Sequence, residues 1–383
     1  MKNFQTKLDV IGNNIANVNT YGFKKGRVTF KDMMSQTVAG ASAATDLRGG
    51  KNPTQVGLGS SLATIDTIHT GSSLQTTGRS LDVGIDGDGY FVVKQGDAEF
   101  YTRAGNFYLD EGGTLVNADG YKVQAYENGV LRDIKVDINA IVPSQQTTKI
   151  QIDGNFPNGL SGTTETTKQI KIVDEEGKEH SLELKFTSTG TDNEWNIVIT
   201  DYSTDPASES EIDIDFSGAG HPGETITVND GAGGTKDITI DIEFGNITTT
   251  PGNLNALFTP DGTTQGSLES FNIGQTGEIN GVFSNGRVQT LGILAIAKFS
   301  NSSGLSKAGN NLFRNSVNSG EANYSTPGGN GSGTISSGSL EMSNVDLSEE
   351  FTEMIVSQRG FQANTRIITT SDEILQELVN LKR

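Results

Sequence analysis

Two pairs of carboxylates are the residues whose type and spacing come nearest to an active site. Asp213 and Asp215 form one pair, and Asp241 and Glu243 the other, each in a segment that alternates apolar and polar residues. Residues two apart on a β-strand share one face at ~7 Å, near the separation of the acid and base in some glycosidases. The same alternation also predicts the solvated face of a half-buried strand. We adopt the solvated face and keep a secreted carbohydrate-active enzyme as the alternative.

A glycine-rich loop offers a second candidate, for a dinucleotide. Residues 218–223 match the spacing GxGxxG after a predicted strand. That motif binds a pyrophosphate only where a helix follows the loop. Here Thr225 to Val228 alternates like a strand, and Pro222 interrupts the loop. The sequence therefore predicts no cofactor.

The remaining candidates are metal and nucleophile sites. Asp82, Asp86 and Asp88 lack the spacing and the closing glutamate of a calcium loop, and are typical of tight turns. The 3 histidines share no motif with a serine or an aspartate, and the chain has no cysteine. We therefore predict no catalytic, cofactor-binding or metal-binding residue and no enzymatic activity.

Helical periodicity marks the two ends of the chain. Near the C-terminus, apolar residues recur at four- and three-residue steps at Leu347, Phe351, Met354, Phe361, Ile368, Leu375 and Val379. This pattern predicts a helix of ~36 residues and ~54 Å, too long for one compact domain to cover. Near the N-terminus the same spacing joins Phe4, Leu8, Ile11, Ile15 and Val18. We expect the two helices to pair, either as an ordinary core or as a seam of coiled-coil type.

Composition describes the chain between these helices. Of 383 residues, 33% are hydrophobic and 48 are glycine, which is typical of short strands and many turns. Residues 143–270 hold 22 Asp and Glu against 6 Lys and Arg, and so carry most of the net charge of −19. This balance disfavours nucleic acid as a partner. No apolar run is long enough to span a membrane, and the N-terminus lacks the apolar core of a cleaved signal peptide.

A faint repeat organises the β region. Residues 91–94 and 102–107 are similar to residues 294–298 and 306–313, on the other side of the acidic segment. The simplest account is one β domain in two halves with the acidic segment inserted. Inside the insert, strict alternation predicts half-buried antiparallel strands. The expected fold is therefore multidomain and mainly β, with paired terminal α-helices and a discontinuous β domain that carries an inserted all-β domain of sandwich or barrel type.

The ends of the chain also carry motifs of a known family. Residues 11–24 resemble the N-terminal motif of the bacterial flagellar rod and hook proteins, and residues 343–351 with 358–364 resemble their C-terminal motif. Residues 81–91 and 101–107 are similar to the β region of that family. The motif residues singled out are Asn13, Asn14, Ala16, Asn17, Asn19, Thr20, Gly22, Phe23, Ser343, Asn344, Val345, Asp346 and Leu347.

The repeat and the acidic segment, together with the resemblance, give a domain plan. Residues 1–24 and 343–383 are expected to form a terminal helical domain that lines an inner tube, where the apolar residues of both helices make assembly contacts. The other expected parts are connecting segments at 25–59 and 339–342, a discontinuous β domain at 60–142 and 271–338, and an acidic all-β outer domain at 143–270.

Within this family, an inserted domain of this size resembles the hook members rather than the shorter distal rod members, which remain the alternative. The resemblance implies a structural subunit that polymerises with its own copies into a curved flexible tube, a universal joint between rod and filament. Further implied partners are the distal rod, the hook cap, the hook–filament junction proteins and the flagellar type III export apparatus. It also implies an extracellular place in the flagellum, reached without a cleaved signal peptide, and no cofactor, nucleic acid or membrane insertion. Relatives usually begin some residues before the position of Met1.

Overall fold

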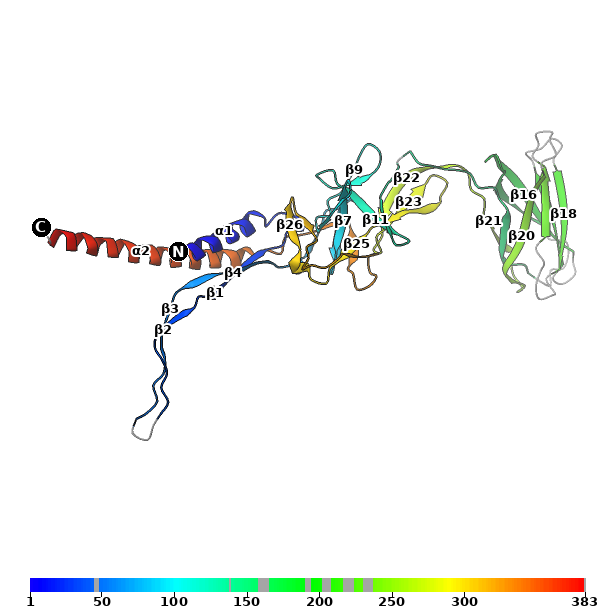
Figure 1. Ribbon diagram of the computed structural model, residues 1–383. Helices are drawn as coiled ribbons and strands as arrows, with labels where there is room; N and C mark the ends of the chain where they lie inside the picture. Colours follow the sequence, from blue (N-terminus) through cyan, green and yellow to red (C-terminus); the bar gives the residue numbers. More distant parts are fainter. Residues whose placement is uncertain are drawn as a thin grey trace. The chain divides into compact units, whose positions relative to one another are not determined.

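The protein is mainly β, with one long helix near each end. The computed structural model describes residues 1–44, 48–137, 139–157, 165–189, 194–201, 208–215, 224–229 and 237–381. The helices are α1 (Lys2–Ala16) and α2 (Leu347–Leu381), and strands fill the chain between them (Figure 1). Two compact units result: residues 1–136, 272–280 and 290–383 form the first, and residues 137–271 and 281–289 the second. This architecture confirms the expected fold class, whereas the detailed domain boundaries stay a prediction.

Two four-stranded sheets make up the second unit's sandwich. One has the order β19-β20-β14-β21 and the other the order β15-β16-β17-β18. Their bounds are β14 Lys149–Asn155, β15 Glu165–Val173, β16 Glu179–Ser188, β17 Glu194–Asp201, β18 Ser208–Asp215, β19 Glu224–Asn229, β20 Asp237–Thr248 and β21 Asn255–Pro260. Inward side chains of both sheets, such as Ile152 and Leu184, form one buried cluster. Period-two alternation produces this arrangement because it places every second side chain on the inner face.

One sheet joins both halves of the predicted β domain in the first unit. Its central order is β26-β27-β8-β7-β11-β10-β9. Its strands are β7 Tyr90–Gln95, β8 Ala98–Thr102, β9 Tyr108–Leu109, β10 Leu115–Val116, β11 Lys122–Glu127, β12 Val130–Asp133, β25 Ile296–Lys298, β26 Ser306–Gly309, β27 Leu312–Arg314 and β28 Asn323–Ser325. The two repeat segments lie side by side, since β25 pairs with β7 and β27 with β8, both antiparallel.

Smaller sheets complete the fold. β6 (Val83–Asp86) pairs with β29 (Thr334–Ser337), and β5 (Leu74–Thr76) pairs with β30 (Ser339–Glu341). A four-stranded sheet has the order β13-β22-β23-β24, with bounds Ile141–Val142, Gly266–Ile273, Glu278–Phe283 and Val288–Ile293. A short 3-10 helix covers Ser302–Gly304.

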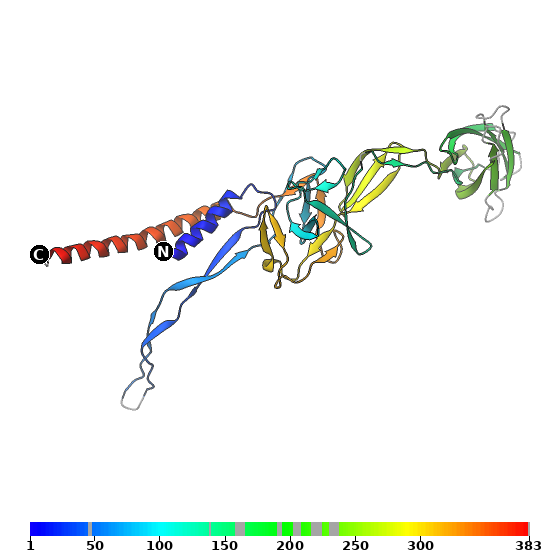
Figure 2. The same ribbon diagram turned by 45° about the horizontal axis from the view of Figure 1, so that its top comes forward.

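A long hairpin corrects the sequence analysis. β1 (Gly26–Asp32) pairs with β4 (Ser60–Thr67), and β2 (Ser35–Ala39) pairs with β3 (Thr54–Gly57), as Figure 2 shows. Within the expected connecting segment at 25–59, residues 26–32, 35–39 and 54–57 therefore form strands, and residues 60–67, which were expected in the β domain, pair with residues 26–32. The alternation of buried and exposed residues that identifies a strand is missing, because every residue of β2 and β3 is exposed.

The sandwich carries its own spectroscopic probe for a first prediction. Trp195 is the only tryptophan, is 2% exposed, and belongs to the same cluster as Phe186, which is fully buried. Phe186→Ala leaves a cavity and should cost about 4 kcal/mol. A urea titration followed by Trp195 fluorescence should show a lower midpoint. Thr167→Ala, at an exposed position on neighbouring β15, is the control and should shift the midpoint little; equal shifts in the two variants would contradict the assigned core.

Candidate functional site

The carboxylates that the structure describes, Asp213, Asp241 and Glu243, do not converge on a site, and the side chain of Asp215 lies outside the described residues. Asp213 on β18 is exposed and accepts a hydrogen bond from Asn196 Nδ2 at 2.7 Å. Asp241 and Glu243 are exposed on β20, in the other sheet, and Glu243 forms an ion pair with Lys149. These positions fit the solvated strand face. Residues 218–223, which match the dinucleotide spacing, lie outside the described residues.

The two histidines that the structure describes belong to different units, and His221 lies outside the described residues. His180 is buried in the second unit beside Asp174, with Nε2 and Oδ2 separated by 3.0 Å, whereas His69 belongs to the first unit. Among the residues that the structure describes, no group of three or more His, Asp or Glu side chains is placed to hold a metal ion. The geometry therefore directs attention to the chain ends, where motif residues converge.

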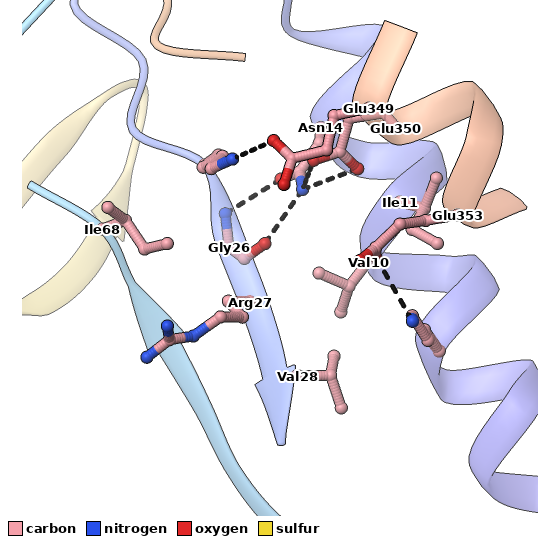
Figure 3. A pocket seen from close by; sticks show the side chains of 12 residues that line it. Val10, Ile11, Asn14, Gly26, Arg27, Val28, Ile68, Glu349, Glu350 and Glu353 are labelled. Atoms are coloured by element: carbon pink, nitrogen blue, oxygen red, sulfur yellow. Dashed lines mark hydrogen bonds and ion pairs between the residues drawn. The ribbon is translucent and has the colours of Figure 1, made fainter. Parts of the chain in front are cut away.

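Asn14 joins three elements at one point of the first unit. Its side-chain amide donates to Gly26 O on β1 at 2.9 Å and to both carboxylate oxygens of Glu350 on α2 at 3.2 Å (Figure 3). Its Oδ1 accepts the Gly26 N–H at 2.9 Å. Asn14 is 2% exposed and Glu350 is 5% exposed. One asparagine thus ties the first helix to the last helix and to the hairpin, because an amide both donates and accepts.

Charged residues surround this contact. Glu349, Glu350 and Glu353 on α2 line a pocket of about 260 Å³ together with residues of α1 and β1, and their side chains face those two elements in Figure 3. Lys25 Nζ lies 2.7 Å from Glu349, and Lys7 Nζ lies 3.3 Å from Glu353. Burial raises the pKa of Glu350, against the opposing hydrogen bond from Asn14. The arrangement holds two helices together through polar contacts rather than through an apolar seam alone.

A second cluster of buried charges lies at the base of the helices. Lys24 Nζ is 2.6 Å from Glu341 Oε1, and Arg103 Nη1 is 3.2 Å from Glu341 Oε2. Lys24 also donates to Thr70 O at 2.7 Å. All three charged side chains are almost completely buried. Burial lowers the pKa of Lys24, an effect that Glu341 opposes. The cluster fastens the segment after α1, the strand before α2 and the turn after β8 to one another.

His69 and Tyr90 extend this cluster. The guanidinium carbon of Arg103 lies 5.3 Å from the centre of the Tyr90 ring, and the Tyr90 hydroxyl lies 2.7 Å from His69 Nδ1. Burial, with help from the charges of Lys24 and Arg103, lowers the pKa of His69 to about 4. The imidazole is therefore neutral in the folded protein at neutral pH.

Several motif residues form hydrogen bonds with the backbone at the same junction. Gly22 has φ +68°, its N–H donates to Glu341 O at 2.8 Å, and a Cβ there would lie 2.5 Å from the Arg103 carbonyl carbon. Asn344 accepts the Lys25 N–H at 2.7 Å, and Asp346 Oδ1 caps α2 by accepting the Ser348 N–H at 2.8 Å. These motif residues therefore stabilise the junction between the end of α1, β30 and the start of α2. Similarity to a family does not by itself reveal this structural role.

The helix contact face differs from the predicted ladder. On α1, Ile11 is buried and Phe4, Leu8 and Ile15 are half-buried, but the helix ends at Ala16, so Val18 lies beyond it. On α2, Met354 and Phe361 are half-buried. The other predicted residues of the ladder are exposed: Leu347, Phe351, Ile368, Leu375 and Val379.

Small and polar residues form the actual contact on α2. Glu350 and Ser357 are buried, and a Cβ on Gly360 would lie 2.8 Å from the Phe4 ring. A search for apolar periodicity misses these positions because none of the three is apolar and large. Lys24, Arg103 and Glu341 carry no such signal either, since a buried charge has no sequence pattern of its own. The role of the exposed ladder residues as assembly contacts stays a prediction.

Comparisons with known proteins agree on one family. Three family models match: flagella basal body rod protein at residues 1–24, flagellar hook protein FlgE/F/G D1 domain at 84–156, and flagellar basal body rod FlgEFG protein C-terminal at 336–381. The flagellar hook protein FlgE of Treponema pallidum is 37% identical, over 100% of this chain and 98% of the relative. The flagellar basal-body rod protein FlgG of Bacillus subtilis is 42% identical, over 100% of this chain and 96% of the relative.

A more distant relative and a solved structure extend the picture. The hook protein FlgE of Escherichia coli is 34% identical over 98% of this chain and 96% of its own length. The crystal structure of the Helicobacter pylori hook protein FlgE2 matches with a TM-score of 0.53 and 14% identity, covering 70% of this chain and 100% of that one. At this identity, the structural match supports the fold alone.

Asn14 supports a prediction with a close control. Asn14→Asp places a second buried carboxylate beside Glu350 and removes the donor to Gly26 O, which should cost about 3 kcal/mol. Amide hydrogen exchange in α1 should then accelerate by about a hundredfold, since every 1.4 kcal/mol is about a factor of ten. Asn13→Asp, at the exposed neighbouring position, should leave the exchange nearly unchanged. Unchanged protection of α1 in Asn14→Asp would refute the role of the contact.

His69 predicts how stability depends on pH. The folded protein binds a proton at His69 only near pH 4, whereas the unfolded chain binds it near the ordinary pKa of 6.5. The unfolded state therefore holds more protons between these values, and stability should fall as the pH falls from 6.5 to 4, by at most about 1.4 kcal/mol per pH unit. Urea titrations should show a flatter pH dependence for His69→Gln.

Glu350 supplies the opposite sign as a check. Its raised pKa lets the folded protein keep a proton that the unfolded chain releases above the ordinary value of 4.5. Its contribution to stability is therefore lost as the pH rises. Glu350→Gln should steepen the loss of stability on acidification, and a flatter profile would contradict the assignment.

Proposed function

Because the chain belongs to the family of flagellar hook and basal-body rod proteins, we propose that it is a structural subunit of the flagellar hook. Many copies would assemble into a curved, flexible tube that transmits torque from rod to filament. The observation that carries the proposal is the similarity to hook proteins along the whole chain, including the T. pallidum relative at 37% identity. The role is structural, and no catalytic step is assigned to any residue.

The surface of α2 supports assembly with other copies. Its C-terminal part exposes a set of large apolar side chains that no other described element covers: Ile367, Ile368, Ile374, Leu375, Leu378, Val379 and Leu381. An apolar surface of this kind marks an interaction site. Contacts between different surfaces of successive copies that do not close into a ring generate a helical tube.

The hairpin and the insert fit the same role. An isolated two-stranded ribbon is marginally stable in water, and this one exposes Met34, Val38, Val56 and Leu58, which suits contact with neighbouring copies. The acidic second unit would stay hydrated and resist non-specific association.

The proposal extends to location and partners. As a hook subunit, the protein would pass through the flagellar type III export apparatus without loss of a signal peptide and lie outside the cell. It would contact the distal rod, the hook cap and the hook–filament junction proteins, and no nucleic acid. In the part of the chain that the structure describes, no helix is long and apolar enough to cross a membrane.

A distal rod subunit is the second candidate. The B. subtilis protein named as a basal-body rod protein is 42% identical and matches over 96% of its own length. The two roles share the same terminal helices, so the structure of the motifs does not separate them. The hook and the distal rod occupy different places in the flagellum, and this difference separates the two roles.

A gene deletion distinguishes these roles. Electron microscopy of basal bodies from the deletion strain should show a complete distal rod without a hook, and the intact gene should restore the hook. A strain that also lacks the distal rod would favour the rod subunit. A strain that keeps a normal curved hook would refute the proposal. Complementation with Asp9→Asn, a change at an exposed position of α1, should succeed where Asn14→Asp fails, because Asn14 is buried and hydrogen-bonded to Glu350 on α2.

A further inference from the structure

A groove of about 660 Å³ lies between the segment that follows α1 and the turns of the β domain, all within the first unit. Two of the apolar residues that line it, Phe23 and Leu312, are largely buried. Its walls carry an unusual concentration of asparagines, from residue 13 to residue 19 on one side and around residues 106 and 310–311 on the other. Apolar residues and amide walls together suit an extended peptide.

The groove is held in shape by the chain itself. Asn310 and Asn311, in the turn between β26 and β27, have φ values of 47° and 60°, so this turn adopts a left-handed conformation that asparagine tolerates. Asn311 Nδ2 donates to Tyr21 O at 2.6 Å and thereby ties the turn to the opposite wall. Asn310 Nδ2 donates to Asp119 Oδ1 at 3.2 Å, so the carboxylate that lines the groove already has a hydrogen-bond partner.

Other asparagine side chains that line the groove are not hydrogen-bonded in this way. Within the described residues, the side chains of Asn13, Asn19 and Asn106 make no hydrogen bond to the protein. Each amide offers a carbonyl acceptor and two N–H donors, the complement of the N–H and C=O groups of an extended backbone. The groove can therefore recognise a main chain without requiring a particular sequence.

Lys307 supplies a charge preference. Its Nζ lies 5.2 Å from the centre of the Phe23 ring, and no carboxylate among the described residues pairs with it. The neighbouring protein atoms displace water from the ammonium and lower its pKa. Lys24, which also lines the groove, is already paired with Glu341. Lys307 is thus a solvent-accessible cation, partly surrounded by protein, that has no carboxylate partner among the described residues.

We propose that this groove receives an extended acidic segment of a second copy of the same chain, with a carboxylate placed against Lys307 and the main chain bonded to the free asparagine amides. Charge complementarity favours another copy as the occupant, because the chain has 47 Asp and Glu against 28 Lys and Arg. The inference rests on the proposed function in so far as copies must associate. It adds a specific surface and a specific cation to that association.

Zero-length cross-linking tests the contact. Full-length protein labelled with ¹⁵N is mixed with unlabelled protein, polymerised, and treated with a carbodiimide, which joins amines only to carboxylates in contact. Mass spectrometry should find peptides of mixed isotope content that link Lys307 to an Asp or Glu of another copy. The dilute monomer should give no such peptide. A Lys307 cross-link confined to one chain, or none in the polymer, would overturn the proposal.

Matched variants test the role of the charge. Lys307→Met keeps an unbranched side chain of similar length without the charge and should raise the critical concentration for polymerisation about tenfold, as loss of a charge pair at an interface would. Lys307→Arg retains the charge and should polymerise nearly as the parent does. Asn19→Ala should raise the critical concentration without touching the ion pair. An unchanged critical concentration in both Lys307→Met and Asn19→Ala would overturn the proposal while leaving the hook assignment intact.

Two further outcomes separate the alternatives. If sodium acetate protects Lys307 from modification in the monomer and no cross-link between copies forms, the groove binds small carboxylates and the proposal fails. If the parent protein does not polymerise at all, the proposed function fails on its own. The same isotope-mixing experiment at high monomer concentration then decides about the groove, and absence of the mixed peptide overturns it.

Discussion

The burial of charge at the base of the two helices is the constraint on which the rest of the first unit depends. Glu341 accepts from both Lys24 and Arg103 at 2.6 and 3.2 Å, in a place that water does not reach. Removal of one partner would leave a buried charge unpaired, which is far more costly than the loss of an exposed ion pair. Three segments remote in sequence must therefore meet in one geometry. The helices, the hairpin and the sheet all leave from this point.

The contact between Asn14 and Glu350 continues the same logic along the helices. Close approach of α1 and α2 is possible because Gly360 leaves room for the Phe4 ring and Ser357 is small. The polar contacts set the orientation of the pair, while most large apolar side chains of α2 remain in water. Polar residues therefore hold the two helices together, and the exposed apolar residues of α2 remain free to contact further copies. This separation of polar contacts within the chain from apolar surfaces for assembly is the physical basis of the proposed function.

The groove at Lys307 differs from those apolar surfaces in kind. Its asparagine amides and the Lys307 ammonium offer directional hydrogen bonds and a charge rather than a large apolar area. Such contacts suit the selection of one relative position between neighbouring copies. Apolar helix faces alone tolerate sliding, whereas an ion pair and main-chain hydrogen bonds fix a position. Both kinds of surface leave the first unit's own junction undisturbed, because Lys24 and Glu341 are already satisfied.

The sequence by itself determined the all-β insert, the two-part β sheet and the terminal helices, because each depends on a local period or a repeat. Strict alternation produced the sandwich around Phe186, and the repeated segments became the paired strands β7 and β25. Only the tertiary structure decided which face of α2 meets α1, since Glu350 and Gly360 carry no apolar signal. It also decided that β2 and β3 pair as a ribbon, because strands exposed on both faces have no reason to alternate. Buried charges escape sequence analysis for a different reason: the partners of Glu341 lie far away in the chain, and pairing between distant residues leaves no local pattern.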